Sequence, residues 1–328
     1  MHLDSANISP DRVMKVADRI IGECMGVKPG ESVLVITDTI RKDLGEPIYR
    51  AALDRGNDAV YMEMKPRRIS GEEPPQAIAE AMENTDVAIC MTTVSLTHTQ
   101  AKINAVKKGA RIATMPFGSK STDFVTRIFT GGGMTVDFEK MDTNIRRLAK
   151  KLEGAPQAHI KTEKGTDLAI DLAGRKFYTD TGIARTPGRF TNLPAGELFI
   201  APVSANGVAV IDVTMGRLGK LMSPLTLTFK DGTVASIEGE RSKELESLLD
   251  SFGPNARRIA ELGIGMNPKA RICGLLVEDE KVGNTVHVAL GDSHGFGGDV
   301  HVGLHVDGVM SGPGLTFDEE TIDIGDYL

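Results

Sequence analysis

The chain has 328 residues, of which 41% are hydrophobic and 25% charged, with a formal net charge of −7. This length is sufficient for two domains of ordinary size, and the acidic balance argues against nucleic-acid binding because no basic surplus exists to neutralise phosphates. No apolar run is long enough to span a bilayer, and the N-terminal residues lack the apolar core of a signal peptide, so we expect no membrane association.

The three cysteines, Cys24, Cys90 and Cys273, are far apart and odd in number. Cys24 and Cys90 have apolar neighbours, which indicates buried free thiols and not a disulfide framework or a zinc knuckle. These features favour a cytoplasmic protein.

The first half of the chain alternates predicted helices with short apolar strands. Helices are expected over residues 11–25, 42–55, 75–84, 99–108, 123–129 and 138–151. Strands are expected over residues 32–37, 59–64, 87–92 and 111–115. The run SVLVIT at 32–37 is continuously apolar, as a strand buried on both faces of a parallel sheet requires. The alternation predicts an α/β domain over residues 1–155, with an open, mostly parallel sheet.

The first strand of this domain is not followed by a phosphate-binding loop. Its turn reads Asp38-Thr39-Ile40-Arg41-Lys42 and contains neither GxGxxG nor GxxxxGK[ST]. Without such glycines the backbone cannot approach a pyrophosphate closely, which disfavours a dinucleotide cofactor.

Residues 156–328 predict an α+β, β-rich domain that begins after the break at Gly154-Ala155-Pro156. Strands are expected over residues 167–172, 176–179, 198–202, 207–214, 225–230, 233–238, 300–310, 315–317 and 321–324. Asp231-Gly232 is typical of a hairpin turn between two of them. Helices are expected over residues 242–252 and 255–262.

Four of the seven histidines lie between Asn284 and Met310. They are His287, His294, His301 and His305. Imidazole and carboxylate groups are the usual ligands of Zn, Mn, Co and non-haem Fe. In a strand, His305 and Asp307 point to the same face, and on an unbroken strand His301 shares it as an alternative or supporting ligand. A polar loop that is rich in histidine by chance is the less favoured interpretation.

Two glutamates upstream are candidates to complete such a site. Glu197 follows a Pro/Gly turn at the start of a buried strand. Glu261 is expected near the C-terminus of the helix at 255–262, where the helix dipole disfavours a carboxylate unless solvent or a cation is near. Taken singly, each glutamate would more commonly lie on the surface.

The segments NLPAGELFIAP, ELGIGMNP, GNTVHVALGDS and LHVDGVM, in this order, resemble the thermophilic aminopeptidase family, the aminopeptidase T and aminopeptidase S group of metallopeptidases. The resemblance covers most of the chain. It implies an α/β domain followed by a metal-binding catalytic domain, a homodimer, and a peptide substrate. The implied ligands of two divalent ions (Zn, Co or Mn) are Glu197, Glu261, His287, His305 and Asp307.

The same resemblance implies a metal-dependent aminopeptidase that removes N-terminal residues with a water activated by two metals. Glu261 would bridge the ions or take the proton of that water. The family has a tyrosine that stabilises the tetrahedral intermediate; here His294 stands in the corresponding place and is the second candidate catalytic residue.

A second hypothesis rests on another branch of this superfamily, the 2,5-dihydroxypyridine ring-cleaving dioxygenases. These use one non-haem Fe(II), which His287, His305 and Asp307 would hold here. The presence of both Glu197 and Glu261 favours the peptidase, because a single iron site needs fewer carboxylates. A third hypothesis, a ligand-binding protein without catalysis, would leave the histidine cluster without a function.

Overall fold

The structure is a computed structural model that describes residues 9–328. Residues 1–8 lie outside the described residues. They include the start of the predicted N-terminal domain and part of the segment examined for a signal peptide. The chain divides into two compact units. The first comprises the described residues up to Phe138 together with Asp180–Ala195, and the second comprises Glu139–Thr179 and Gly196–Leu328. Within residues 9–328, no helix combines the length and apolarity needed to cross a membrane.

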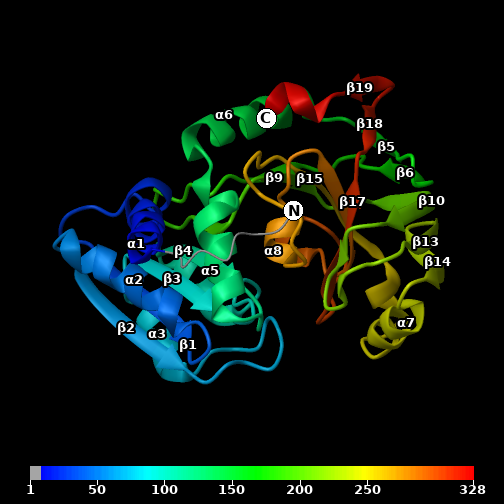
Figure 1. Ribbon diagram of the computed structural model, residues 1–328. Helices are drawn as coiled ribbons and strands as arrows, with labels where there is room; N and C mark the ends of the chain where they lie inside the picture. Colours follow the sequence, from blue (N-terminus) through cyan, green and yellow to red (C-terminus); the bar gives the residue numbers. More distant parts are fainter. Residues whose placement is uncertain (1–8) are drawn as a thin grey trace. The chain divides into compact units, whose positions relative to one another are not determined.

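The first unit has a parallel sheet whose described strands follow the order β2-β1-β3-β4-β8. The strands are β1 (Ser32–Asp38), β2 (Asp58–Met64), β3 (Val87–Thr92), β4 (Arg111–Pro116) and β8 (Phe190–Asn192). The helices are α1 (Pro10–Arg19, continued by a π-helical turn at Ile20–Cys24), α2 (Lys42–Asp54), α3 (Gln76–Met82), α4 (Gln100–Lys107) and α5 (Thr122–Gly131), followed by a 3₁₀ turn at Gly133–Thr135. Figure 1 shows α1, α2, α3 and α5 beside the sheet.

Burial explains why these segments form parallel strands. Every residue of β3 is buried, and in β1 only Ser32 is partly exposed. Strands buried in this way satisfy their backbone groups by pairing within the sheet, and their apolar side chains require cover on both of its faces. Cys24 and Cys90 lie in this core as free thiols, as predicted. The expected open parallel sheet is therefore confirmed.

The second unit contains two antiparallel sheets among its described residues, each with seven strands. The first runs β14-β13-β10-β6-β5-β18-β19 and the second β12-β11-β17-β16-β15-β9-β7. The strands are β5 (Gln157–Lys161), β6 (Asp167–Asp171), β7 (Phe177–Asp180), β9 (Glu197–Ile200), β10 (Ser204–Ile211), β11 (Thr214–Met215), β12 (Gly219–Lys220), β13 (Leu225–Lys230), β14 (Thr233–Gly239), β15 (Ile259–Gly265), β16 (Thr285–Gly291), β17 (His305–Ser311), β18 (Gly314–Phe317) and β19 (Glu320–Ile322). The helices are α6 (Phe138–Lys151), α7 (Ser242–Asp250) and α8 (Leu276–Asp279), with 3₁₀ turns at Pro254–Arg257, His294–Phe296 and Ile324–Tyr327.

The hairpin predicted at Asp231-Gly232 is confirmed. Lys230 pairs with Thr233, and both turn residues have positive φ, 50° at Asp231 and 77° at Gly232. This is the backbone that a two-residue turn between twisted strands requires. The two-part fold, α/β followed by β-rich, agrees with the predicted fold class.

The expected domain limit at residue 155 falls inside the second unit. Helix α6 belongs almost wholly to that unit, and residues 180–195 return to the first one. The return is made by β8, which pairs in parallel with β4 through Ile112 and Phe190. The Gly154-Ala155-Pro156 break follows the end of α6 and does not separate the two units. A change in composition cannot reveal that β8 pairs with β4 and so returns to the first unit.

The predicted helix at 255–262 is wrong. Residues Pro254–Arg257 form a short 3₁₀ turn and Ile259–Gly265 form β15, between β9 and β16. Glu261 therefore lies within a buried strand, and the argument from a helix dipole does not apply to it.

The predicted strand at 300–310 begins only at His305, and an unpredicted strand, β16, covers Thr285–Gly291. Residues 301–304 are irregular, so His301 does not share a strand face with His305. The many glycines between residues 291 and 303 separate the two strands by a loop.

Candidate metal site

Four adjacent strands of the second unit, β9, β15, β16 and β17, carry the five residues expected to bind metal. Directly paired residues of antiparallel strands point to the same face of a sheet. The pairs are Glu197 with Gly265, Gly263 with His287, Glu261 with Ala289, Ala289 with Asp307, and Gly291 with His305. All five side chains therefore project from one face, and they alternate with glycine and alanine.

Gly263 makes the close approach of His287 possible. A Cβ atom at Gly263 would lie 1.9 Å from Nε2 of His287. The imidazole thus lies across the backbone of the neighbouring strand, where any other residue would displace it. Gly263, the first glycine of ELGIG, is therefore required for this arrangement of His287.

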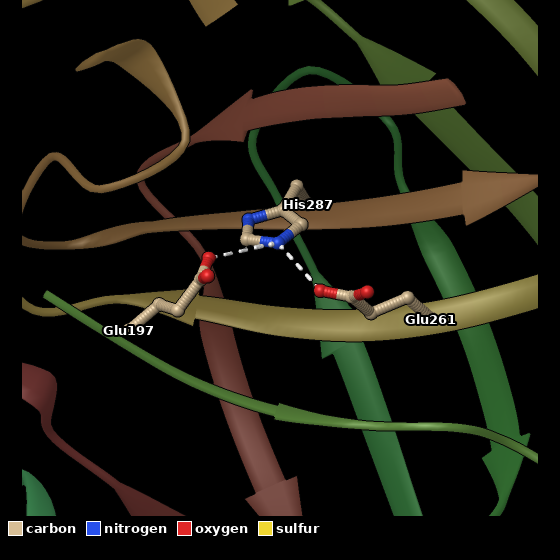
Figure 2. A group of neighbouring side chains, drawn as sticks. All are labelled: Glu197, Glu261 and His287. Atoms are coloured by element: carbon tan, nitrogen blue, oxygen red, sulfur yellow. Dashed lines mark hydrogen bonds and ion pairs between the residues drawn. The ribbon is translucent and has the colours of Figure 1, made fainter. Parts of the chain in front are cut away.

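Glu261 lies between the two imidazoles. Its Oε1 is 3.2 Å from Nε2 of His287, and its Oε2 is 3.4 Å from Nε2 of His305. His287 Nε2 also lies 3.5 Å from Oε2 of Glu197, and His305 Nε2 lies 3.2 Å from Oδ1 of Asp307. Figure 2 shows Glu197 and Glu261 approaching the same imidazole nitrogen of His287.

Among the described residues, these contacts gather ligand atoms in two groups that share Glu261. One group is Glu197, Glu261 and His287, and the other is Glu261, His305 and Asp307; the ligand atoms of each lie within 4.8 Å of one another. The set expected for a single iron, His287 with His305 and Asp307, is not one such group, because Glu261 lies between the histidines.

The two groups differ in exposure. The side chain of His287 is 1% exposed, whereas that of His305 is 17% exposed. Glu261 and Asp307 lie between these values, at 8% and 11%. A small molecule therefore reaches the group at the His305 end more readily than the group around His287.

The pKa values reflect mutual attraction inside a buried site. Burial acts to lower the pKa of His287, but Glu261 and Glu197 raise it to about 9. Against burial, Asp307 and Glu261 also raise the pKa of His305 well above its usual value. Burial acts to raise the pKa of Glu261 and of Asp307, and the imidazoles hold both below their usual range. For Glu197, burial dominates and raises the pKa to about 8. Since ligands bind metals in their deprotonated form, an ion would displace protons here.

His305 is held in the tautomer that suits a metal ligand. Its Nδ1 donates a hydrogen bond of 2.7 Å to the carbonyl oxygen of Asp292, which can only accept. The Nε2 atom is thereby directed at Glu261 and Asp307. Histidine ligands of metals usually have their second nitrogen fixed in this way.

Lys281 contacts the cluster through Glu197, and no sequence motif predicts this contact. Its ammonium is 2.5 Å from Oε1 of Glu197 and 2.7 Å from Oε1 of Glu280, and its side chain is only 2% exposed. The segment VEDEK has the charge density of a solvated surface, so it was not a candidate. The apolar residues that flank it, Leu275, Leu276 and Val282, were the available signal of burial.

Aromatic side chains adjoin the His305 end of the cluster. The ring of Phe296 lies 5.9 Å from that of His305, edge to face, and 5.5 Å from that of Phe199. Tyr178 stacks on Phe199 at 5.8 Å. Phe199 shares the face of Glu197, two residues away on β9, which is a signal that the sequence did contain.

His294 and His301 lie outside the buried cluster. Both are exposed, and their rings contact each other at 5.4 Å. His301 also lies 3.2 Å from Oδ2 of Asp292. The structure thus brings together the five predicted metal-binding side chains but not His294, the residue expected to stabilise a peptidase intermediate.

Solved structures with this fold include a dioxygenase and an aminopeptidase. The structure of 2,5-dihydroxypyridine dioxygenase from Pseudomonas putida KT2440 has a TM-score of 0.80 and 18% identity, covering 96% of both chains. Wild-type AmpT from Thermus thermophilus has a TM-score of 0.69 and 16% identity, covering 93% of this chain and 94% of that one. At these identities both show the fold alone. Comparison with curated protein sequences yields no match.

The family comparison overturns the aminopeptidase prediction. The model of the NicX family, 2,5-dihydroxypyridine 5,6-dioxygenase, matches residues 13–325. The resemblance to the aminopeptidase T group therefore holds for the fold. The predicted function, hydrolysis of a peptide substrate by a water that two metal ions activate, is wrong. The family match supports an enzyme, an oxidoreductase and not a hydrolase, and together with the grouped carboxylates and imidazoles it supports metal binding. It belongs to the NicX family of 2,5-dihydroxypyridine 5,6-dioxygenases.

Proposed function

We propose that the protein is a mononuclear non-haem Fe(II) dioxygenase that opens the ring of a hydroxylated pyridine, with 2,5-dihydroxypyridine as the first substrate to test. The observation that carries this proposal is the contact of Phe296 with His305. Phe296 and Phe199 thereby form an aromatic wall beside the more accessible group, Glu261, His305 and Asp307. The family match over residues 13–325 supports the same reaction.

The donor set of the accessible group fits iron. Glu261, His305 and Asp307 offer one imidazole and two carboxylates, and His287 lies on the other side of Glu261. Non-haem Fe(II) oxygenases commonly use two imidazoles and one carboxylate, and the second imidazole available in this cluster is that of His287. An Fe(II) ion bound by these residues would supply the redox chemistry that the reaction of O₂ with an aromatic ring requires.

The aromatic side chains would bind and orient the substrate ring. Phe296 and Phe199 present ring surfaces next to the cluster, and offset or edge-to-face contacts between rings are favourable by about 0.5–1.5 kcal/mol each. They would also keep water from the ring during the reaction. A peptide would gain little from such a wall.

In the reaction named for the family, the bond between ring carbons 5 and 6 breaks and each carbon gains one oxygen atom of O₂. Carbon 5 becomes a carboxylic acid and carbon 6 becomes a formyl group on nitrogen. All atoms of substrate and O₂ are retained, so no further reductant is consumed.

The test is oxygen uptake by protein loaded with Fe(II) without air and then given 2,5-dihydroxypyridine and O₂. We expect one O₂ consumed for each ring lost, and a fall of more than about 100-fold in Asp307→Asn. Asp318→Asn, an exposed carboxylate in a turn, serves as the matched control and should keep full activity. Absence of substrate-dependent uptake in protein that contains iron would refute the proposal.

A further inference from the structure

Lys281 is placed at the Glu197 end of the cluster by the fold of its own segment. Its backbone nitrogen bonds to the carbonyl of Glu278, and its carbonyl accepts from the nitrogen of Asn267. These bonds fix the turn that follows α8. The ammonium has little freedom to leave, because its side chain is 2% exposed and ion-paired with two carboxylates.

Gly265 allows this turn to reach the sheet. A Cβ atom at Gly265 would lie 2.2 Å from the carbonyl oxygen of Val282 and 3.0 Å from that of Glu280. Gly265 also pairs directly with Glu197. Because Gly265 has no side chain, the backbone on both sides of Lys281 can pack against Gly265, the residue that pairs with Glu197.

A divalent ion and this ammonium would compete for the same carboxylate. Lys281 lies 2.5 Å from Oε1 of Glu197, while Oε2 of Glu197 has no hydrogen-bond partner among the described residues and faces Nε2 of His287 at 3.5 Å. An ion bound by Glu197, Glu261 and His287 would have the fixed positive charge of Lys281 on the far side of one ligand. In a buried site of low dielectric, that repulsion is strong.

We propose that the ammonium of Lys281 serves as a built-in cation that replaces a second divalent ion at Glu197, and so limits the cluster to one metal ion, held at the His305 end. The inference rests on the proposed function, because it explains how ligands that suit two ions hold the single ion of a dioxygenase. Lys281 is a positioning residue, which acts on the metal site through Glu197.

The test is a titration of the full-length, metal-free protein with Mn(II), followed by equilibrium dialysis, elemental analysis and electron paramagnetic resonance. We expect one Mn(II) per chain in the natural protein, with the signal of an isolated ion. Lys281→Met removes the charge and keeps the length of the side chain, and it should bind two Mn(II) per chain with loss of signal through coupling between neighbouring ions. Lys281→Arg, the matched control, keeps the charge and should bind one.

A second pair of variants decides the matter even if Lys281→Met does not fold. Glu197→Gln should still bind one Mn(II), with an affinity within about threefold of the natural protein, whereas Glu261→Gln should lose at least tenfold. Two ions in the natural protein, a single ion in folded Lys281→Met, or loss of the ion in Glu197→Gln would each overturn the inference. The proposed function fails separately: protein with one ion that consumes no O₂ contradicts the function and leaves this inference intact.

Discussion

At the scale of single residues, the site depends on positions without side chains as much as on its ligands. Gly263 admits His287, and Gly265 admits the turn that carries Lys281. Neither glycine has a positive φ, so close approach and not backbone conformation explains them. Substitution of either one should therefore act on the metal site through steric displacement.

Gly263→Ala should weaken metal binding by at least about tenfold and destabilise the fold by about 1–3 kcal/mol, because the new Cβ overlaps His287. Calorimetric titration with Mn(II) and urea denaturation measure the two effects. Gly295→Ala is the control, since nothing lies within 4 Å of a Cβ there. Unchanged metal affinity in Gly263→Ala would contradict the account of this glycine.

Phe296→Ala should raise KM for an aromatic substrate roughly tenfold, equivalent to about 1.4 kcal/mol of lost ring contact, while the metal content stays the same. Steady-state oxygen uptake and elemental analysis measure these quantities. Phe296→Tyr keeps a ring and should stay within about twofold of the natural protein. An equal KM in Phe296→Ala would show that the substrate does not use this wall.

The metal-free protein should lose stability as pH rises from about 6.5 to about 9. The pKa of His287 is about 9 in the fold, against about 6.5 in an unfolded chain, and that of Glu197 is raised to about 8. A raised pKa contributes stability that is complete below the unfolded value and is lost as pH rises through the folded value. Urea denaturation in chelator measures this, and His287→Gln should flatten the dependence. A rise in stability over the same range would be incompatible with these shifts.

At the scale of elements, the apolar run of β1 and the alternation of β13 and β14 could be predicted, whereas β15 and β16 were missed although every residue of both is buried. The five side chains predicted to bind metal do lie together in two groups that share Glu261. The helix predicted at 255–262 failed because Ala260, Glu261 and Leu262 favour helices intrinsically, while pairing with β9 and β16 decides the outcome. Strand pairs between distant segments leave no local signal. For the same reason β8, which returns to the sheet of the first unit, could not be foreseen.

The error in function has a physical cause too. The ligand types on the β9–β17 face are those that two metal ions or one would use, and the fold is shared with AmpT as well as with a dioxygenase. A fold does not determine its chemistry. Lys281 is proposed to favour one ion over two, and Phe296 is proposed to favour a ring over a peptide. Both lie in segments that look like ordinary surface in the sequence.

At the scale of the whole molecule, the metal should stabilise the second unit, because all its ligands lie there. Fe(II) at about one hundred times its Kd should add about 2.7 kcal/mol, which raises the Tm of that unit by roughly 5–10 °C. Scanning calorimetry without air, before and after chelation, measures the shift. The Asp307→Asn variant should show almost none of it, and a metal-insensitive Tm in the natural protein would contradict the site.

The most direct test of a ring-cleaving dioxygenase is the fate of oxygen. Fe(II)-loaded protein would be given 2,5-dihydroxypyridine under ¹⁸O₂, quenched early, and the ring-opened product weighed by mass spectrometry. We expect both labelled atoms of one O₂ to appear in one product molecule. A product that carries oxygen from water alone, or an intact ring in the presence of bound iron, would contradict it.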